Sequence, residues 1–185
     1  MTPEPEWVDL GLPSGLLWAK ANLGATLPES LGVYFSWGNT EGHPIGSAYD
    51  FSQEVYDTTP AAAISADLSL NQDAARANLG NPWRMPADAE FQELYDNCTS
   101  VWTTMNGVAG RLFTSRVNGN TLFFPAAGYF SGLSLNGRGS RGYYWSSGYY
   151  SDSNARFFYF DSSSVSPQDR SERRDGFSVR PVREA

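Results

Sequence analysis

The stretch GRLFTSRVNGNTLFFPA, residues 110–126, holds two runs of alternating apolar and polar residues around the dipeptide Asn118–Gly119. Alternation with a period of two is typical of a strand that buries one face. Asn-Gly accepts the positive φ angles that a type I′ turn requires. The stretch therefore predicts a β-hairpin and places antiparallel strands near the centre of the chain.

On the N-terminal side of this hairpin, the apolar spacing changes to that of a helix. Residues 85–98 place three large apolar or aromatic side chains on one face and acidic side chains on the other. Residues 71–80 predict a shorter helix, with Asn71 as its N-cap and Gly80 closing its C-terminus.

On the C-terminal side, strands are expected at residues 143–147, 155–161 and 177–183, where Gly, Ser and Asp separate them. Two helices among short antiparallel strands and long loops predict an α+β domain. The 185 residues fit one domain, 1–185, in which 42–69 reads as a surface excursion rich in turn residues.

The composition excludes several classes of protein. Aromatic residues make up 15% of the chain and charged residues only 18%, with 18 Gly and 11 Pro, which excludes a coiled coil, a helical repeat and a disordered tail. No apolar run reaches the roughly 20 residues of a membrane helix, so no membrane insertion is expected. The start of the chain predicts no signal peptide.

The charge argues against nucleic acid as a partner. The net charge is -7 and the pI is near 4.6, whereas binding to phosphate backbones depends on cationic charge. Of the 13 basic residues 12 are Arg, and 8 of these lie in residues 138–185. Arginine offers a planar fork of donors that suits recognition.

The motifs that could carry catalytic or cofactor chemistry are weak. GRGSRG, residues 137–142, matches a dinucleotide fingerprint in letters, but an aromatic, strand-like run follows it instead of a helix. His43 lies in a turn without a partner ligand, so an exposed loop histidine is expected, and Cys98 is expected to be a buried thiol. We expect no cofactor and no enzymatic activity.

Acidic residues leave two alternatives open. The cluster on residues 88–96 indicates a solvated helix face, although its spacing alone is compatible with a glycosidase pair. YDFSQE at 49–54 and YSDSN at 150–154 could each supply oxygen ligands to calcium. No metal-ligand set is assigned.

The segment 138–175 has an unusual composition. Of its 38 residues, 28 are Ser, Arg, Tyr, Asp or Gly, and none is Leu, Ile, Met, Lys, Thr or His. Tyrosine provides rigid contact area, Ser and Gly adapt, and Arg and Asp make directional contacts, as in an antibody paratope. A solvated β surface without a ligand is the alternative, and composition alone does not separate the two.

We therefore predict a ligand-binding segment at residues 138–175. Fourteen residues form its predicted binding surface, called the display surface below: Arg138, Ser140, Arg141, Tyr143, Tyr149, Tyr150, Asp152, Ser153, Tyr159, Asp169, Arg170, Ser171, Arg174 and Asp175. Five other residues, which lie between the display residues or after them in the chain, are expected to be buried: Trp145, Phe158, Phe160, Val179 and Val182.

Six ordered motifs carry a resemblance to a known family. They are VDLGLPSGLLWAKANLGA at 8–25, YFSWG at 34–38, NPWRMPADAEFQEL at 81–94, FFPAAGY at 123–129, GYYWSS at 142–147 and GFSVRPVRE at 176–184. Together they resemble the bacterial C-type-lectin-fold domain related to formylglycine-generating enzymes. The resemblance implies a C-type lectin fold in which the N-terminal and C-terminal strands pair.

The enzyme's chemistry does not transfer with this resemblance. Formylglycine-generating enzymes use a pair of cysteines near the C-terminus, whereas the single cysteine here is Cys98. An enzyme of formylglycine-generating or carbohydrate-active type is the competing class.

A narrower resemblance is to the variable proteins of diversity-generating retroelements, which end in a motif similar to GFSVRPVRE. Adenine-directed mutagenesis of AAY codons yields residues that include Tyr, Ser, Asp, Gly, Arg and Phe, but never Lys, Met, Gln, Glu or Trp. Residues 138–175 follow this pattern except at Trp145, Gln168 and Glu172. The resemblance implies a hypervariable receptor for a protein or glycan, located at a bacterial cell surface or in a phage virion. A surface-binding domain without diversification is the alternative.

Overall fold

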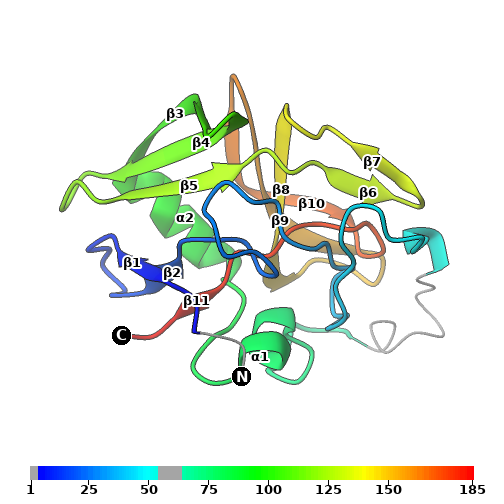
Figure 1. The fold of residues 1–185 in the computed structure, drawn as a ribbon. Helices are drawn as coiled ribbons and strands as arrows, with labels where there is room; N and C mark the ends of the chain where they lie inside the picture. The colour runs from blue at the N-terminus through cyan, green and yellow to red at the C-terminus, as the bar shows by residue number, and fades with distance from the viewer. Residues whose placement is uncertain (1–3, 54–63) are drawn as a thin grey trace.

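The computed structural model describes residues 4–53 and 64–185. The described elements follow the chain from β1 to β11 (Figure 1). They are β1 (Trp7–Asp9), β2 (Leu17–Ala19), the 3-10 helix η1 (Phe51–Gln53), α1 (Ala74–Leu79), α2 (Asp88–Asn97), β3 (Cys98–Met105), β4 (Val108–Ser115), β5 (Thr121–Pro125), β6 (Tyr129–Ser131), β7 (Ser134–Asn136), β8 (Arg141–Tyr149), β9 (Asn154–Asp161), β10 (Val165–Glu172) and β11 (Val182–Arg183).

Within the described chain, the strands form four small antiparallel sheets. Their orders are β1-β2-β11, β3-β4-β5, β10-β9-β8 and β6-β7. Helix α2 lies against the β10-β9-β8 sheet and adjoins β3 (Figure 1). The C-terminal strand β11 pairs with β2, so the expected pairing of terminal strands is confirmed.

The main core lies between α2 and the two large sheets, and aromatic rings fill it. Phe91 of α2 stacks on Phe158 of β9 with 4.8 Å between ring centroids and an interplanar angle of 3°. Phe113 and Phe124 of the β3-β4-β5 sheet contact the same Phe158 ring. The core thus joins elements far apart in the chain.

A second core covers the opposite face of the β10-β9-β8 sheet. Trp145 of β8 stacks on Phe177 at 4.0 Å, and Phe157 of β9 meets Phe177 edge-on at 4.9 Å. Consecutive strand residues point to opposite faces, so Tyr144 and Trp145 enter different cores. The sheet is therefore buried on both faces over much of its length.

Both predicted helices are present, but the N-cap of the first was wrong. Asp73, not Asn71, precedes α1, and its Oδ1 accepts a hydrogen bond from the Arg76 backbone N–H at 2.9 Å. The other oxygen of Asp73 accepts from the Met85 N–H at 2.8 Å, which ties the helix to the chain beyond it. Gly80 ends α1 with a φ of 79°, as predicted.

The predicted hairpin is confirmed as β4 and β5, but its turn type is not. Gly119 has a positive φ of 76°, whereas Asn118 is not among the described non-glycine residues with positive φ. A tight Asn-Gly turn lies instead between β3 and β4, where Asn106 and Gly107 have φ angles of 48° and 81°. Two positive φ angles are the signature of type I′.

The predicted fold class, an α+β domain with a C-type lectin fold, requires correction. Strand accounts for 40% of the described chain and helix for 11%, which makes the fold mostly β. Four strands, β3, β6, β7 and β10, were not predicted at all. Of the strand predicted at 177–183, only Val182–Arg183 and isolated bridges at the start are present.

The region 42–69 is described only in part. Phe51 and Ile64, on either side of residues outside the description, are 1% and 5% exposed and belong to different core clusters. Among the described residues, no helix is long and apolar enough to span a bilayer.

Candidate functional site

The display surface lies on β8, β9 and β10, the loop between β8 and β9, and the segments just before β8 and just after β10. None of its fourteen residues is buried: Tyr143, Tyr149, Tyr159, Ser171 and Asp175 are half-buried and the other nine are exposed. The five residues expected to be buried are each 0% exposed, and that prediction is confirmed. They are Trp145, Phe158, Phe160, Val179 and Val182.

Three tyrosines form the most compact group on this surface. The ring of Tyr143 lies 4.6 Å from that of Tyr129 and 5.3 Å from that of Tyr159, between centroids. Tyr143 and Tyr159 are direct partners in the register of β8 and β9, and Tyr129 reaches them from β6. Phe177 packs against Tyr143 at 5.1 Å, so the group is built on the second core. The sequence prediction omitted Tyr129.

Charged groups surround this tyrosine group. The hydroxyl of Tyr159 donates a hydrogen bond of 2.8 Å to Asp161 Oδ2, and burial together with this bond raises the pKa of Tyr159 to about 12. Hydrogen bonds from Ser163, Tyr159 and Ser164 hold the pKa of Asp161 well below its usual range. Burial also raises the pKa of Tyr143, beside the Arg141 guanidinium. Tyr143 and Tyr159 therefore carry neutral hydroxyl groups at physiological pH.

A second group surrounds Tyr149 at the far end of β8. Its hydroxyl donates to Asp152 Oδ1 at 2.9 Å, and its backbone N–H donates to Asp67 Oδ1 at 2.8 Å. The guanidinium of Arg173 lies over the Tyr149 ring at 5.2 Å and over the Trp37 ring at 4.7 Å. These contacts fix the ring at the rim of the sheet.

Arg173 itself is a structural residue that the sequence did not identify. It is 1% exposed, and its guanidinium donates to the backbone oxygens of Ile64 and Ser151. In the sequence it follows Glu172 in a run of charged residues, a pattern that is typical of a solvent-exposed segment. Its contacts with Ile64 and Trp37, both over 100 residues away in the chain, help to bury it.

A third group combines Tyr150 with two arginines. The guanidinium carbons of Arg156 and Arg170 lie 5.4 and 4.7 Å from the centroid of the Tyr150 ring. Arg156 also lies 3.7 Å from a carboxylate oxygen of Asp88 at the start of α2. Arg156 was not among the predicted surface residues.

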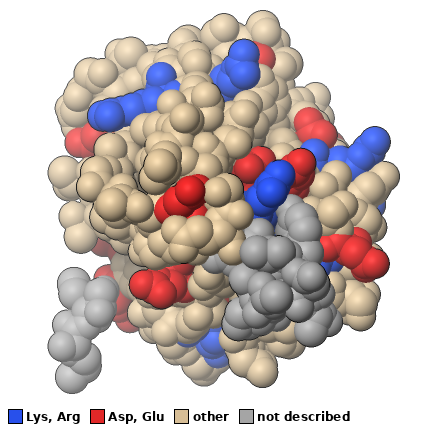
Figure 2. All heavy atoms as spheres, turned by 90° about the vertical axis from the view of Figure 1, so that its right-hand side faces the viewer, with Lys and Arg blue, Asp and Glu red and all other residues tan. Residues whose placement is uncertain are grey.

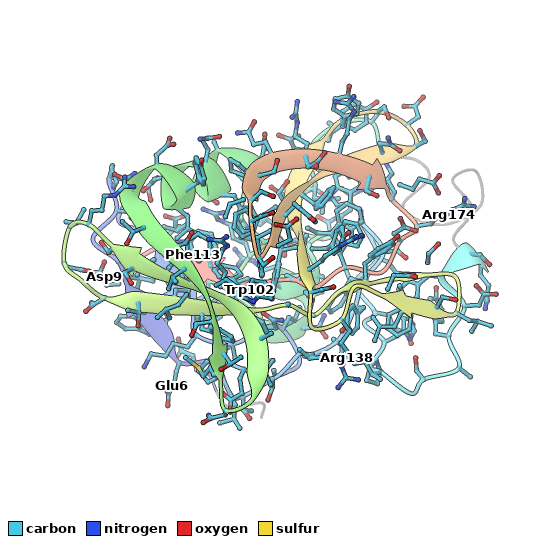
Figure 3. All side chains as sticks on the ribbon, turned by 90° about the horizontal axis from the view of Figure 1, so that it is seen from above. Glu6, Asp9, Trp102, Phe113, Arg138 and Arg174 are labelled. Atoms are coloured by element: carbon cyan, nitrogen blue, oxygen red, sulfur yellow. The ribbon has the colours of Figure 1, made fainter. Side chains whose placement is uncertain are left out.

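Arg138, Arg174 and Asp175 belong to none of these three groups. Arg138 and Arg174 come from separate loops and lie apart from each other (Figure 3). Arg174 is ion-paired with Glu172 at 2.7 Å. Burial and the nearby Glu172 carboxylate raise the pKa of Asp175 to about 6. The face on the right of Figure 1 carries acidic and basic side chains scattered among uncharged residues (Figure 2).

The residues considered for catalytic chemistry have structural surroundings. Cys98 is buried as expected, and burial raises the pKa of its thiol to about 11. His43 is not the exposed loop residue expected, because it is half-buried and stacked on Tyr49 at 3.5 Å. Among the described residues, no group of three or more His, Cys, Asp or Glu side chains is placed to hold a metal ion.

Several cavities adjoin the described chain, and one of them touches the display surface. A cavity of about 240 Å³ is lined by Arg138, Gly139, Leu31 and Ala126, among others. Cavities of about 450 and 380 Å³ lie elsewhere, against β3 and β2 respectively. The tyrosine and arginine groups are thus features of an open surface.

Comparison with known proteins gives one match. Residues 99–182 match a family described as a domain of unknown function, DUF8237. This segment contains the whole display surface and the complete β10-β9-β8 sheet. No curated protein and no solved structure matches the chain.

Proposed function

We propose that the chain is a binding module, which presents the display surface to a protein or glycan on a cell surface. The observation that carries the proposal is the division of neighbouring strand residues. Trp145 and Phe158 are fully buried, while Tyr143 and Tyr159, on the same two strands, are half-buried and reach solvent. A buried aromatic interior thus supports the tyrosine rings that the sheet presents.

The chemistry of the surface suits recognition. Aromatic residues and arginine dominate the binding energy of protein interfaces, usually through a few central positions. Tyr129, Tyr143 and Tyr159 offer ring area and hydroxyl groups that are already packed against one another, which lowers the entropy cost of binding. We take this tyrosine group as the centre of the contact.

We further propose that the display surface is diversified by a retroelement. Residues 138–175 have the composition that mutagenesis of AAY codons produces. The fourteen display positions all reach solvent, whereas Tyr144, Ser146 and Arg173 in the same segment are buried. The DNA around the gene tests this point. A near-copy of the final cassette that differs only at adenines, beside a reverse transcriptase, is the expected finding, and its absence would refute diversification.

A display library tests the binding function itself. The fourteen positions are randomised with NNY codons, and the clones are selected against a panel of proteins and glycans. We expect folded clones and specific binders, because the fully buried side chains of both cores are untouched. A control library randomises exposed positions on the other sheet: Thr99, Val101, Thr104, Arg116 and Thr121. Unfolded display clones, or binders at equal frequency from the control, would contradict the proposal.

A further inference from the structure

We propose that Tyr150, Arg156 and Arg170 form a site for a carboxylate group of the partner. The inference rests on the binding function proposed above and names the chemistry of one contact. Arg170 of β10 lies directly opposite Arg156 of β9 in the strand register. Like charges placed directly opposite each other destabilise a sheet, so an anion between them would relieve that repulsion.

Gly148 has no side chain, and this leaves space for Arg156 to pack against β8. A Cβ atom at this position would lie 2.6 Å from Asp88 Oδ1 and 3.2 Å from Arg156 Cδ. Because glycine has no side chain, Asp88 and Arg156 both pack onto β8, where Arg156 Nε lies 3.7 Å from Asp88 Oδ2. Gln168 donates to the backbone oxygen of Asp88 at 3.4 Å and holds β10 to the start of α2.

The second arginine keeps its donors available. Within the described chain, no hydrogen-bond acceptor meets the Arg170 guanidinium, which rests over the Tyr150 ring at 4.7 Å. The two acids close to Arg170 along β10 make other contacts: Asp169 accepts from the Arg170 backbone N–H, and Glu172 pairs with Arg174. A guanidinium held against a ring loses little further freedom when it binds a bidentate acceptor.

The charge of the site selects the class of anion. Two arginines face one carboxylate, Asp88, which leaves about one positive charge uncompensated. A monoanionic carboxylate balances that charge, whereas a phosphate monoester carries up to about two negative charges at neutral pH and exceeds it. The occupant we infer is therefore an Asp or Glu side chain of a protein partner.

A titration of the whole chain with small anions tests this site without the partner. Sodium acetate and sodium phosphate are added at constant ionic strength against sodium chloride, and NMR follows the arginine Nε–H and Tyr150 ring signals. We expect acetate to shift the signals of Tyr150, Arg156 and Arg170 in a saturable way. Arg170→Gln should weaken acetate binding about tenfold, as the loss of a charged hydrogen-bond pair does.

Arg138→Gln is the matched control, since Arg138 is an exposed arginine outside the site. It should leave acetate binding unchanged. Arg170→Lys keeps the charge without the planar fork, and should also weaken binding if the contact is bidentate. Tighter binding of phosphate than of acetate, an equal effect of Arg138→Gln, or no saturable shift would overturn the proposal. Because no partner is needed, such a result is independent of the library selection.

Discussion

Neighbouring side chains on β8 and β9 have opposite roles, and the difference is decided residue by residue. Phe158 is fully buried and contacts Phe91, Phe113 and Phe124, while Tyr150 is 40% exposed and touches only arginine side chains among the ring contacts described. Their rings are similar in size. The loss in free energy of unfolding when each ring is removed therefore reflects how tightly that ring is packed.

Truncation of Phe158 should destabilise the domain far more than truncation of Tyr150. Phe158→Ala leaves a cavity in the main core and is expected to lower the free energy of unfolding by about 3–5 kcal/mol. Tyr150→Ala should lower it by about 1 kcal/mol or less, the value of exposed cation–π contacts. Chemical denaturation of the two variants measures both. Equal losses would mean that the display surface is part of the core.

Asp175 should make stability depend on pH in an unusual direction. Its folded-state pKa of about 6 lies above the ordinary value of 3.8, because burial and Glu172 disfavour the charged carboxylate. Between these two values the folded chain binds more protons than the unfolded chain, so this residue lowers stability as pH rises from about 4 to 6.

The Asp175→Asn variant removes this titration. Its stability relative to the parent should be higher at pH 7 than at pH 4, by about 1 kcal/mol after allowance for solvent screening of a partly exposed group. Thermal melts of both proteins at the two pH values give the difference. A difference of opposite sign would show that the carboxylate is stabilised in the folded chain.

At the scale of elements, backbone conformation decides the β3–β4 hairpin. Gly107 has a φ of 81°, and nothing lies within 4 Å of a Cβ atom placed there. Substitution at this position therefore tests backbone strain without a steric clash. Gly119 in the β4–β5 loop has a similar φ of 76° and equally open surroundings, so it offers a comparison in a longer loop.

Gly107→Val should destabilise the domain by about 1–2 kcal/mol, because a β-branched residue strongly disfavours the left-handed region. Gly107→Asn should cost clearly less, since asparagine tolerates positive φ. Denaturation curves of the two variants provide the measurement. If Asn is as costly as Val, the turn is not governed by φ.

At the scale of the whole molecule, the core joins segments from both ends of the chain. The main cluster combines Leu10 and Trp18 with Phe91 of α2, Phe158 of β9 and Val182 of β11. The segment that matches the domain of unknown function begins at residue 99 and so lacks the first three of these. We expect the ring packing to require the complete set.

Residues 99–182 expressed alone should therefore fail to fold cooperatively. Without Trp18 and Phe91 the aromatic cluster loses two rings. In the whole chain their centroids lie 5.5 Å apart, and that of Phe91 lies 4.8 Å from that of Phe158. Near-UV circular dichroism and a thermal melt, compared with the whole chain, test this. A sharp melting transition of the fragment would contradict it.

Local patterns in the sequence determined the features that depend on neighbouring residues. The spacing of apolar residues predicted α2, the alternation on 110–126 predicted β4 and β5, and the large apolar residues Trp145 and Phe158 were correctly assigned to the interior. These features follow from helix and strand periodicity and from hydrophobicity, which act over a few residues.

Tertiary structure alone decided which segments meet. It assembled four sheets in place of the expected lectin fold, buried Arg173 against Ile64, and brought Tyr129 to Tyr143. Strand β10 illustrates the reason. Its residues are mostly polar and do not alternate with apolar ones, so only its pairing with β9 makes it a strand. Strand pairing and the burial of a charged side chain depend on partners that are distant in the chain. Local sequence patterns do not identify those partners.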